Sequence, residues 1–358
     1  MTEKVLMSGN HIVAEAAVRA GCRFYAGYPI TPQNELTEYM ASAMARLPDG
    51  TFIQAESEIA AINMVLGASM AGSRAMTSSS SPGISLKQEG ISFLSSLELP
   101  AVIVNCMRGG PGLGNIAPSQ GDYFQATRGG GHGDYRTIVL APASGQEIAD
   151  LTAEAFAYAD QYRTPVMILQ DGMMGQMMEP VVLPDPLDPG TLPPKPWVLD
   201  GARGRPSRVI KSLLLDPLVE EALNWKLFHR YNEITKVVQA AQTFMTDDAD
   251  LAVIAYGTAA RIAKGAVKRA RQAGLKAGLF RPITLWPFPK DRLLELSRRI
   301  KHFLVFEMST GQMVEDVRLS LEGAGTVHFY GRPGGPIATP QELEDVIKEV
   351  VGKYGTRA

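Results

Sequence analysis

Short apolar segments alternate with longer helical patterns along this chain of 358 residues, and no other feature of the sequence restricts the fold as much. Most of these segments precede a stretch in which apolar residues recur every three or four positions, as on one face of an amphipathic helix. Strands joined by helices are typical of a parallel sheet, so the sequence predicts an α/β fold. The first group of predicted strands lies at 24–26, 51–55, 75–78, 101–106, 137–142 and 165–170.

The chain divides where its composition changes. Residues 180–206 are rich in Pro, Gly and Asp and predict a linker that runs over the surface. An amphipathic connecting helix is predicted over 218–247, and a second group of strands and helices begins at Leu251. We therefore expect three parts, at 1–180, 181–247 and 248–358.

Composition narrows the class of protein. The formal net charge is −2 and no long basic run occurs, which argues against a nucleic-acid partner. Apolar stretches such as 99–106 are too short to cross a bilayer, and the N-terminus lacks the apolar core of a signal peptide, so we expect a cytoplasmic protein with no membrane partner. Cys22 and Cys106 are far apart in sequence; we expect both to be buried thiols, and two cysteines cannot ligate a four-iron cluster.

The turn at 27–32, Gly-Tyr-Pro-Ile-Thr-Pro, is the first candidate for a functional site. Pro29 and Pro32 fix their own φ and hold Tyr28 and Thr31 in extended conformations. This places the Thr31 hydroxyl at a strand-to-helix junction, where open α/β sheets bind ligands. The alternative is that Thr31 only caps the following helix.

Two further segments place polar groups directly after predicted strands. A Ser-Pro-Gly turn at 81–83 precedes a predicted helix at 84–97, and its alternative is a flexible polar loop. Arg108 directly follows the apolar strand at 101–106. The segment from 109 to 135 carries nine glycines and little periodicity, which predicts an ordered loop at an active site or interface.

The segment at 56–72 predicts a helix that is apolar on nearly every side and therefore buried against a sheet or another subunit. Glu56 and Glu58 lie at its head. A carboxylate there can simply stabilise a helix N-terminus, but so apolar a helix makes a functional carboxylate the better explanation.

Three segments in order, at 27–32, 54–72 and 329–336, resemble the α subunit of the 2-oxoacid:ferredoxin oxidoreductases, and the resemblance extends over nearly the whole chain. The segment at 129–136 resembles the 2-oxoglutarate enzymes of that family. The resemblance implies a thiamine-diphosphate-binding domain of the pyrimidine type, followed by a domain similar to the C-terminal domain of transketolase.

In this family, thiamine diphosphate lies between a pyrimidine-binding and a diphosphate-binding domain, which in short-chain members are on different polypeptides. This chain lacks the Gly-Asp-Gly metal motif of the diphosphate domain and has no metal-ligand spacing of its own. The resemblance thus implies a β subunit that carries the diphosphate site, Mg²⁺ and a 4Fe-4S cluster, an (αβ)2 assembly, and activity only with that partner.

The family's chemistry requires one carboxylate near N1′ of the aminopyrimidine, where a proton promotes activation of the cofactor. The spacing from Glu58 to Gly72 matches the family, so Glu58 is the expected residue. Glu56 is the alternative, or faces a neighbouring subunit. The resemblance also implies five further contacts with the cofactor, by Tyr28, Pro29, Ile30, Ser81 and Pro82.

The implied activity is the reversible, coenzyme A-dependent oxidative decarboxylation of 2-oxoglutarate to succinyl-CoA and CO2, with reduction of ferredoxin. Thr31 would bind the substrate's carboxylate or keto oxygen, and Arg108 would pair with the carboxylate through two hydrogen bonds. A dicarboxylate needs a second cation, for which Lys87 and Arg128 are the first candidates; His132 and Arg136 also come into question. An apolar pocket would instead select a branched-chain 2-oxoacid or pyruvate, and a non-catalytic regulatory subunit is the alternative from another class.

Overall fold

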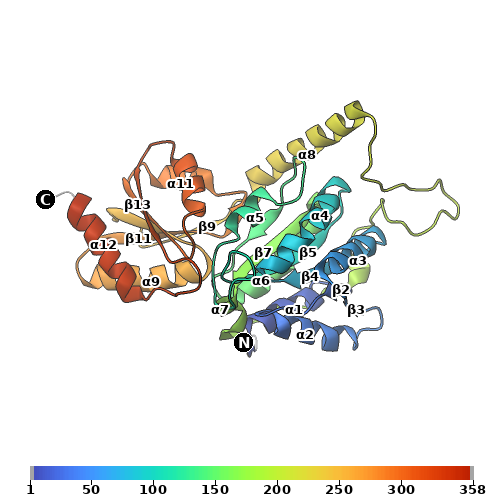
Figure 1. Ribbon diagram of the computed structural model, residues 1–358, viewed down its shortest axis with the longest axis horizontal. Coiled ribbons are helices and arrows are strands. Elements are labelled where there is room, and N and C mark those ends of the chain that lie inside the picture. The colour runs from blue at the N-terminus through green and yellow to red at the C-terminus, as the bar shows by residue number, and fades with distance from the viewer. Residues whose placement is uncertain (1–3, 355–358) are drawn as a thin grey trace.

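The computed structural model describes residues 4–354. Two α/β units lie side by side, and helix α8 (Pro217–Val237) projects beyond them (Figure 1). The predicted α/β fold is confirmed. No described helix is long and apolar enough to cross a membrane.

The first unit contains a seven-stranded sheet in the order β12-β6-β7-β5-β4-β2-β3. Its neighbouring strands are parallel except for β12, which pairs antiparallel with β6 although it comes from the second half of the chain. The strands are β2 (Phe24–Gly27), β3 (Thr51–Gln54), β4 (Ala75–Ser79), β5 (Ala101–Met107), β6 (Ile138–Leu140), β7 (Pro165–Asp171) and β12 (Thr284–Trp286).

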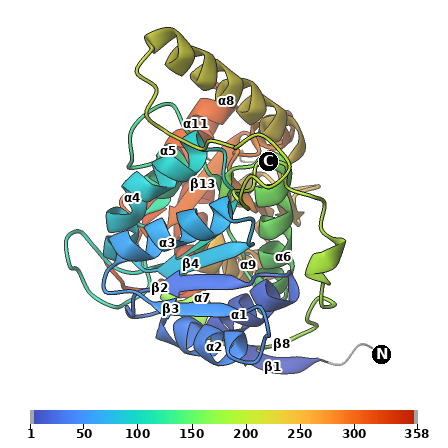
Figure 2. The same ribbon diagram turned by 90° about the vertical axis from the view of Figure 1, so that its right-hand side faces the viewer.

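Helices cover both faces of this sheet (Figure 2). Two separate apolar clusters result, because successive residues of a strand point to opposite faces. One face packs against α3 (Glu58–Met70) and α4 (Ser81–Ser96), and the other against α1 (Gly9–Arg19), α2 (Asn34–Met44) and α6 (Gly145–Tyr162). The smaller elements are β1 (Val5–Ser8), which pairs with β8 (Met178–Val181), α5 (Tyr123–Arg128), α7 (Gly172–Gln176) and a 3-10 turn at Pro189–Thr191.

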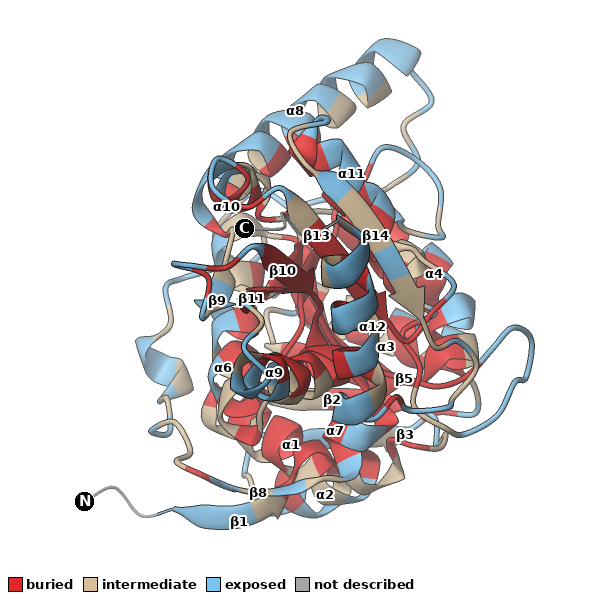
Figure 3. Ribbon diagram, turned by 90° about the vertical axis from the view of Figure 1, so that its left-hand side faces the viewer, coloured by how far each residue is buried: buried red, intermediate tan, exposed pale blue. Residues whose placement is uncertain are grey.

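The second unit contains a five-stranded sheet in the order β14-β13-β10-β11-β9. Only β9 runs antiparallel to its neighbour. The buried strands lie at the centre of the unit in Figure 3. Its elements are β9 (Ala241–Phe244), β10 (Leu251–Ile254), α9 (Gly257–Gln272), β11 (Ala277–Pro282), α10 (Lys290–Leu296), β13 (His302–Glu307), α11 (Met313–Leu321), β14 (Thr326–Gly331) and α12 (Pro340–Tyr354).

Two predicted helices have different limits in the structure. The connecting helix was predicted to reach residue 247, but α8 ends at Val237 because the following residues pair with β11 as strand β9. Helix α4 begins at Ser81, so the Ser-Pro-Gly segment forms its first turn. The alternative of a flexible polar loop at this place is therefore wrong. Cys22 and Cys106 are buried and free, as predicted.

Candidate active site at the carboxyl edge of the first sheet

Three neighbouring strands, β2, β4 and β5, end at one edge of the first sheet, because they run parallel. The segments that follow them carry Thr31, Ser81 and Arg108. Helix α3, which follows β3, begins with Glu58 at the same edge. The topology therefore assembles the predicted site residues from four separate segments of the chain.

A network of hydrogen bonds between buried side chains stabilises the turn after β2. Tyr25 Oη lies 2.6 Å from Ser78 Oγ and 2.9 Å from Thr37 Oγ1, and Gln33 Oε1 accepts from Ser78 at 2.5 Å and from Thr37 at 3.1 Å. Helix α2 is capped at Gln33, so the alternative role of Thr31 as its cap is wrong. The sequence contained no signal for this network, because its members are scattered over two strands and a helix.

The turn itself is open to ligands. Tyr28 and Pro29 are exposed, while Ile30 and Thr31 are half-buried. The Thr31–Pro32 peptide bond is cis.

Glu58 has an unusual environment for a buried carboxylate. It is the first residue of α3, after the cap Ser57, whose Oγ accepts from Ala60 N, and only 6% of Glu58 is exposed. Within residues 4–354 no group donates a hydrogen bond to its carboxylate. Glu56, by contrast, is exposed and precedes the cap. The structure thus leaves the acceptor capacity of the Glu58 carboxylate unused.

Gly83 makes room for this carboxylate. A Cβ atom on Gly83 would lie 2.5 Å from Glu58 Oε1 and 2.0 Å from Ser79 Oγ, closer than side chains approach. The hydroxyls of Ser79 and Ser80 are buried without a hydrogen-bond partner. A concentration of unsatisfied polar atoms is uncommon in a folded chain and indicates a place for an external polar group.

Ser81 belongs to a second polar cluster. Its Oγ donates to Asp122 Oδ2 at 2.6 Å and accepts from Arg108 N at 3.0 Å, and Asn105 Nδ2 donates to the same Asp122 oxygen at 2.9 Å. Burial raises the pKa of Asp122 above its ordinary value, although the bonds from Ser81 and Asn105 act in the opposite direction. Asn105 and Asp122 were missed in the sequence because one lies inside a predicted strand and the other in the glycine-rich segment. Pro82, the next residue, is half-buried.

Arg108 is 7% exposed and already ties two segments together. Its Nη1 donates to Thr31 O at 3.0 Å and its Nη2 to Leu113 O at 3.1 Å, while Nε is buried without a partner. A guanidinium has five N–H donors, so these bonds leave donors for a ligand. The structure brings Arg108 and Thr31 together, and their binding of substrate remains a prediction.

The two preferred second cations are engaged elsewhere. Lys87 has no exposed surface, and its Nζ donates to Thr77 Oγ1 at 2.9 Å. Burial lowers the pKa of Lys87 to about 7, although Glu58 acts to raise it. Arg128 donates from both Nη atoms to Asp316 Oδ1 at 3.1 Å, across to the second unit. Their roles as substrate ligands remain predictions, and the exposed His132 and Arg136 are the other two candidates.

These features fit the aminopyrimidine of thiamine diphosphate. That ring offers acceptor nitrogens and an amino group, and the chain offers the carboxylate of Glu58 and the unpartnered hydroxyls of Ser79 and Ser80. Gly83 keeps the space beside these groups open. Among the described residues no group of three or more His, Cys, Asp or Glu could hold a metal ion.

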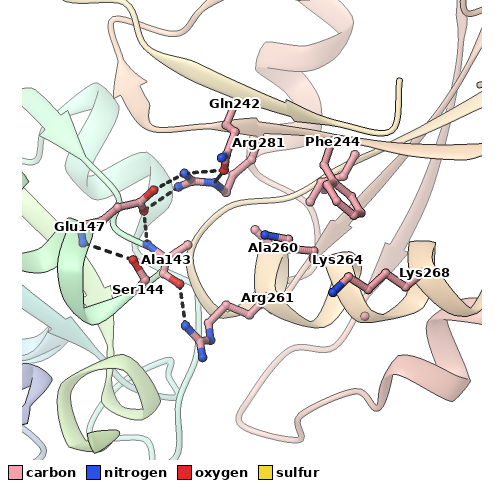
Figure 4. A pocket seen from close by; sticks show the side chains of 12 residues that line it. Ala143, Ser144, Glu147, Gln242, Phe244, Ala260, Arg261, Lys264, Lys268 and Arg281 are labelled. Atoms are coloured by element: carbon pink, nitrogen blue, oxygen red, sulfur yellow. Dashed lines mark hydrogen bonds and ion pairs between the residues drawn. The ribbon is translucent and has the colours of Figure 1, made fainter. Parts of the chain in front are cut away.

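A cavity lies between the units, against α6 and α9 (Figure 4). It measures about 630 Å³, and four of its twelve lining residues are basic. Arg281 is bonded to Glu147, and Arg261 to Glu179 at 2.8 Å, so two of the cations join the units. The sequence signal for this wall was the helix 257–272, which carries five basic residues and no acidic one. The remaining cations on the wall are Lys264 and Lys268.

Comparisons with known proteins match both units of the chain. The family described as pyruvate flavodoxin/ferredoxin oxidoreductase, thiamine diphosphate-binding, matches residues 15–202, and pyruvate:ferredoxin oxidoreductase core domain II matches 249–343. The ketoisovalerate oxidoreductase subunit VorB of Methanothermobacter thermautotrophicus is 48% identical over 97% of this chain and 98% of its own length. The chain belongs to the 2-oxoacid:ferredoxin oxidoreductases. Its first unit is therefore a thiamine diphosphate-binding domain.

Other members of the 2-oxoacid:ferredoxin oxidoreductases are more distant. The 2-oxoglutarate synthase subunit KorA of the same organism is 38% identical over 97% of this chain and 99% of its own. The structure of 2-oxoglutarate:ferredoxin oxidoreductase from Magnetococcus marinus, with 2-oxoglutarate, coenzyme A and succinyl-CoA bound, superposes with a TM-score of 0.83 at 27% identity over 97% of this chain. This chain spans 65% of that one. A split-gene transketolase, at 14% identity over 97% of this chain and 98% of its own and a TM-score of 0.60, shares the fold alone.

Proposed function

We propose that this chain is the catalytic α subunit of an enzyme that couples oxidative decarboxylation of a branched-chain 2-oxoacid to formation of an acyl-coenzyme A and reduction of ferredoxin. The similarity to VorB, 48% against 38% for KorA, is the observation that carries the choice of substrate. The 2-oxoglutarate enzyme expected from the sequence becomes the second candidate, supported by the KorA relatives and the Magnetococcus structure.

The environment of Arg108 supports an apolar substrate. Its guanidinium is available for one carboxylate, whereas Lys87 and Arg128 are occupied by Thr77 and Asp316. The segment after Arg108 carries apolar side chains that are exposed here, Leu113 at 81% and Ile116 at 66%. A site in which Arg108 is available while Lys87 and Arg128 are engaged favours a monocarboxylate with an apolar tail.

Each residue of the site has a definite role in this proposal. When bound, thiamine diphosphate would supply a nucleophilic carbon and an electron sink for the decarboxylation. Glu58 holds a proton at N1′ of the aminopyrimidine. Thr31 and Arg108 orient the 2-oxoacid, and the polar cluster around Asp122 keeps the backbone of Ser81 and Arg108 in place.

We further propose that a β subunit supplies the diphosphate site, Mg²⁺ and the 4Fe-4S cluster, in an (αβ)2 assembly that works in the cytoplasm. The Gly-Asp-Gly metal motif is missing from this sequence, and its two cysteines are buried and separate. Cofactor contacts by Tyr28, Pro29, Ile30 and Pro82 belong to the same proposal.

The substrate is tested with the complex of this chain and its partner, expressed together. Turnover of 2-oxoisovalerate, 2-oxoglutarate and pyruvate is followed with coenzyme A and ferredoxin. We expect kcat/KM for 2-oxoisovalerate to exceed the other two at least tenfold, a ratio within reach of pocket contacts. A higher value for 2-oxoglutarate would select the second candidate, and no turnover of any 2-oxoacid would reject the enzyme proposal.

A further inference from the structure

Helix α9 carries more positive charge than the fold uses. Each of its three arginines forms an ion pair with a carboxylate at 2.7–2.8 Å. Its two lysines, Lys264 and Lys268, form none within residues 4–354, and the Lys264 ammonium lies only over the ring of Phe244, 5.2 Å from its centroid. Like charges four positions apart on a helix lower its stability, so the fold itself does not account for this pair of lysines.

Both lysines line the cavity between the two units (Figure 4). They share one face of α9 and are about 6 Å apart along the helix axis. Glu147 is the one carboxylate among the residues that line the cavity, and both of its oxygens accept from Arg281. The wall therefore keeps the positive charge of the two lysines without a carboxylate to balance it.

Two neutral side chains of the same wall offer hydrogen-bond donors as well. Gln242 Oε1 accepts from Arg281 Nη2 at 3.1 Å, which leaves the NH2 group of Gln242 for a ligand. Ser144 Oγ accepts from Glu147 N at 3.2 Å, which leaves its O–H to donate. A ligand that fills this cavity therefore needs negative charge and several acceptor oxygens.

We propose that this cavity binds the diphosphate group of a nucleotide. Lysine ammonium groups bind phosphates as point charges, and two of them on flexible stems one helical turn apart match two adjacent phosphates. The volume of about 630 Å³ lies within the range of about 300–1,000 Å³ that is typical of sites for small molecules. The cavity therefore has room for the nucleoside beside the phosphates.

The cavity and the Glu58 carboxylate belong to opposite faces of the first sheet. Helix α6, which contributes to the cavity, covers one face, and α3, which begins with Glu58, covers the other. This inference therefore does not rest on the proposed function. A bound diphosphate would contact α9 of the second unit and the start of α6 in the first, and so link the two units. Free nucleoside diphosphates and coenzyme A both carry this group, and the experiment separates them.

The experiment titrates the complex of this chain and its partner, saturated with thiamine diphosphate, with ADP, AMP and coenzyme A by isothermal titration calorimetry. ADP should bind at least about tenfold more tightly than AMP, since AMP lacks the second phosphate and one charge-assisted hydrogen bond contributes about that factor. Lys264→Met and Lys268→Met should each weaken the binding of ADP about tenfold, and the double variant about a hundredfold. Lys276→Met removes an exposed lysine outside the cavity and should leave the affinity unchanged.

The titration with coenzyme A identifies the source of the diphosphate group. If the double variant binds ADP more weakly but coenzyme A as wild type does, the ligand is a free nucleotide. If it also binds coenzyme A at least tenfold more weakly, the cavity takes the nucleotide end of coenzyme A. If the double variant binds both as tightly as Lys276→Met does, the proposal is overturned while the proposed function stands. A complex that binds ADP through these lysines but turns over no 2-oxoacid would reject the proposed function alone.

Discussion

Two buried glutamates of this chain differ in their hydrogen bonds: one carboxylate is bonded within the fold, and the other is available to a ligand. Glu307 ends β13 in the second unit and has no exposed surface. Its oxygens accept from Ser309 Oγ and from the backbone N–H groups of the cap Gln312 and of Met313 and Val314, the first residues of α11, at 2.9–3.1 Å. Glu58, at the head of α3, is almost as deeply buried but accepts no hydrogen bond from residues 4–354.

The difference in accepted hydrogen bonds shows which of the two carboxylates has a structural role. Glu307 satisfies the free N–H groups at the start of a helix that has no side-chain cap at Gln312, so its role is structural. The pKa of Glu307 is raised by burial in spite of these bonds. Glu58 contributes nothing comparable to its own helix, which Ser57 caps. The unsatisfied carboxylate is the one available to a cofactor.

The largest effect expected is on catalysis, from Glu58→Gln. Removal of the proton donor at N1′ should lower kcat of the complex by about 10²–10⁴-fold, while the melting temperature stays within 2 °C. Steady-state kinetics with ferredoxin as acceptor measure this effect. Glu56→Gln is the matched control and should retain wild-type turnover. Full turnover in Glu58→Gln would exclude Glu58 as the proton donor at N1′. The remaining explanations would then be that Glu56 has this role or that the chain is a non-catalytic regulatory subunit.

The second effect is on stability, from Glu307→Gln. An amide at this position cannot accept all four hydrogen bonds and turns its NH2 toward backbone N–H groups, so the free energy of unfolding should fall by about 3 kcal/mol. Urea denaturation of the chain followed by circular dichroism measures the loss. Glu315→Gln, an exposed glutamate on the same helix, should change stability by less than about 0.5 kcal/mol. Equal losses in the two variants would contradict the structural role of Glu307.

The third prediction concerns Lys87→Met and the dependence of stability on pH. Burial lowers the pKa of Lys87 from its ordinary 10.5 to about 7. Between these values the unfolded chain binds one more proton, so this contribution to stability is complete above pH 10.5 and is lost as the pH falls through about 7. Replacing Lys87 should remove a slope of about 1.4 kcal/mol per pH unit. Denaturation at pH 7.5, 8.5 and 9.5 tests this, with the exposed Lys276→Met as control.

The smallest effect is expected from the two helix caps, Ser57 and Ser144. Each accepts a hydrogen bond from the third residue of its helix, α3 and α6. Replacement by Ala should cost about 1 kcal/mol in either case. Only Ser57→Ala should also weaken the binding of thiamine diphosphate, because Ser57 sets the start of the helix that carries Glu58. If Ser144→Ala also weakened the binding of thiamine diphosphate, the cause would be a general loss of stability and not the position of Glu58.

Much of the fold was predictable because periodicity reports on burial. The apolar run at 101–106 predicted the central strand β5, and the two-part α/β organisation follows from the same pattern. Other elements were not predictable, because they depend on distant pairing. The segment 241–244 became strand β9 only by pairing with β11, and 284–286 became β12 by adding to the first sheet. Nothing in either short segment indicates its partner.

The candidate site likewise has residues that the sequence could predict and residues that it could not. Position after a strand was enough to single out Thr31 and Arg108, since strand ends of a parallel sheet meet at one edge, whereas the choice of Glu58 over Glu56 rested on the spacing to Gly72 that the family resemblance implies. The sequence could not show that Asp122 and Asn105 join Ser81, or that Asp316 takes Arg128. These contacts cross large sequence separations, and packing alone decides them.

The sequence by itself determined the alternation of strands and helices, the order of the chemical groups along the chain and the resemblance to a family. Only the tertiary structure decided which of these groups have hydrogen-bond or ion-pair partners within the chain. Lys87 and Glu58 are ordinary charged residues in sequence, but folding leaves both with almost no exposed surface. A charge becomes functional through its desolvation and its neighbours, and those arise only when the chain folds.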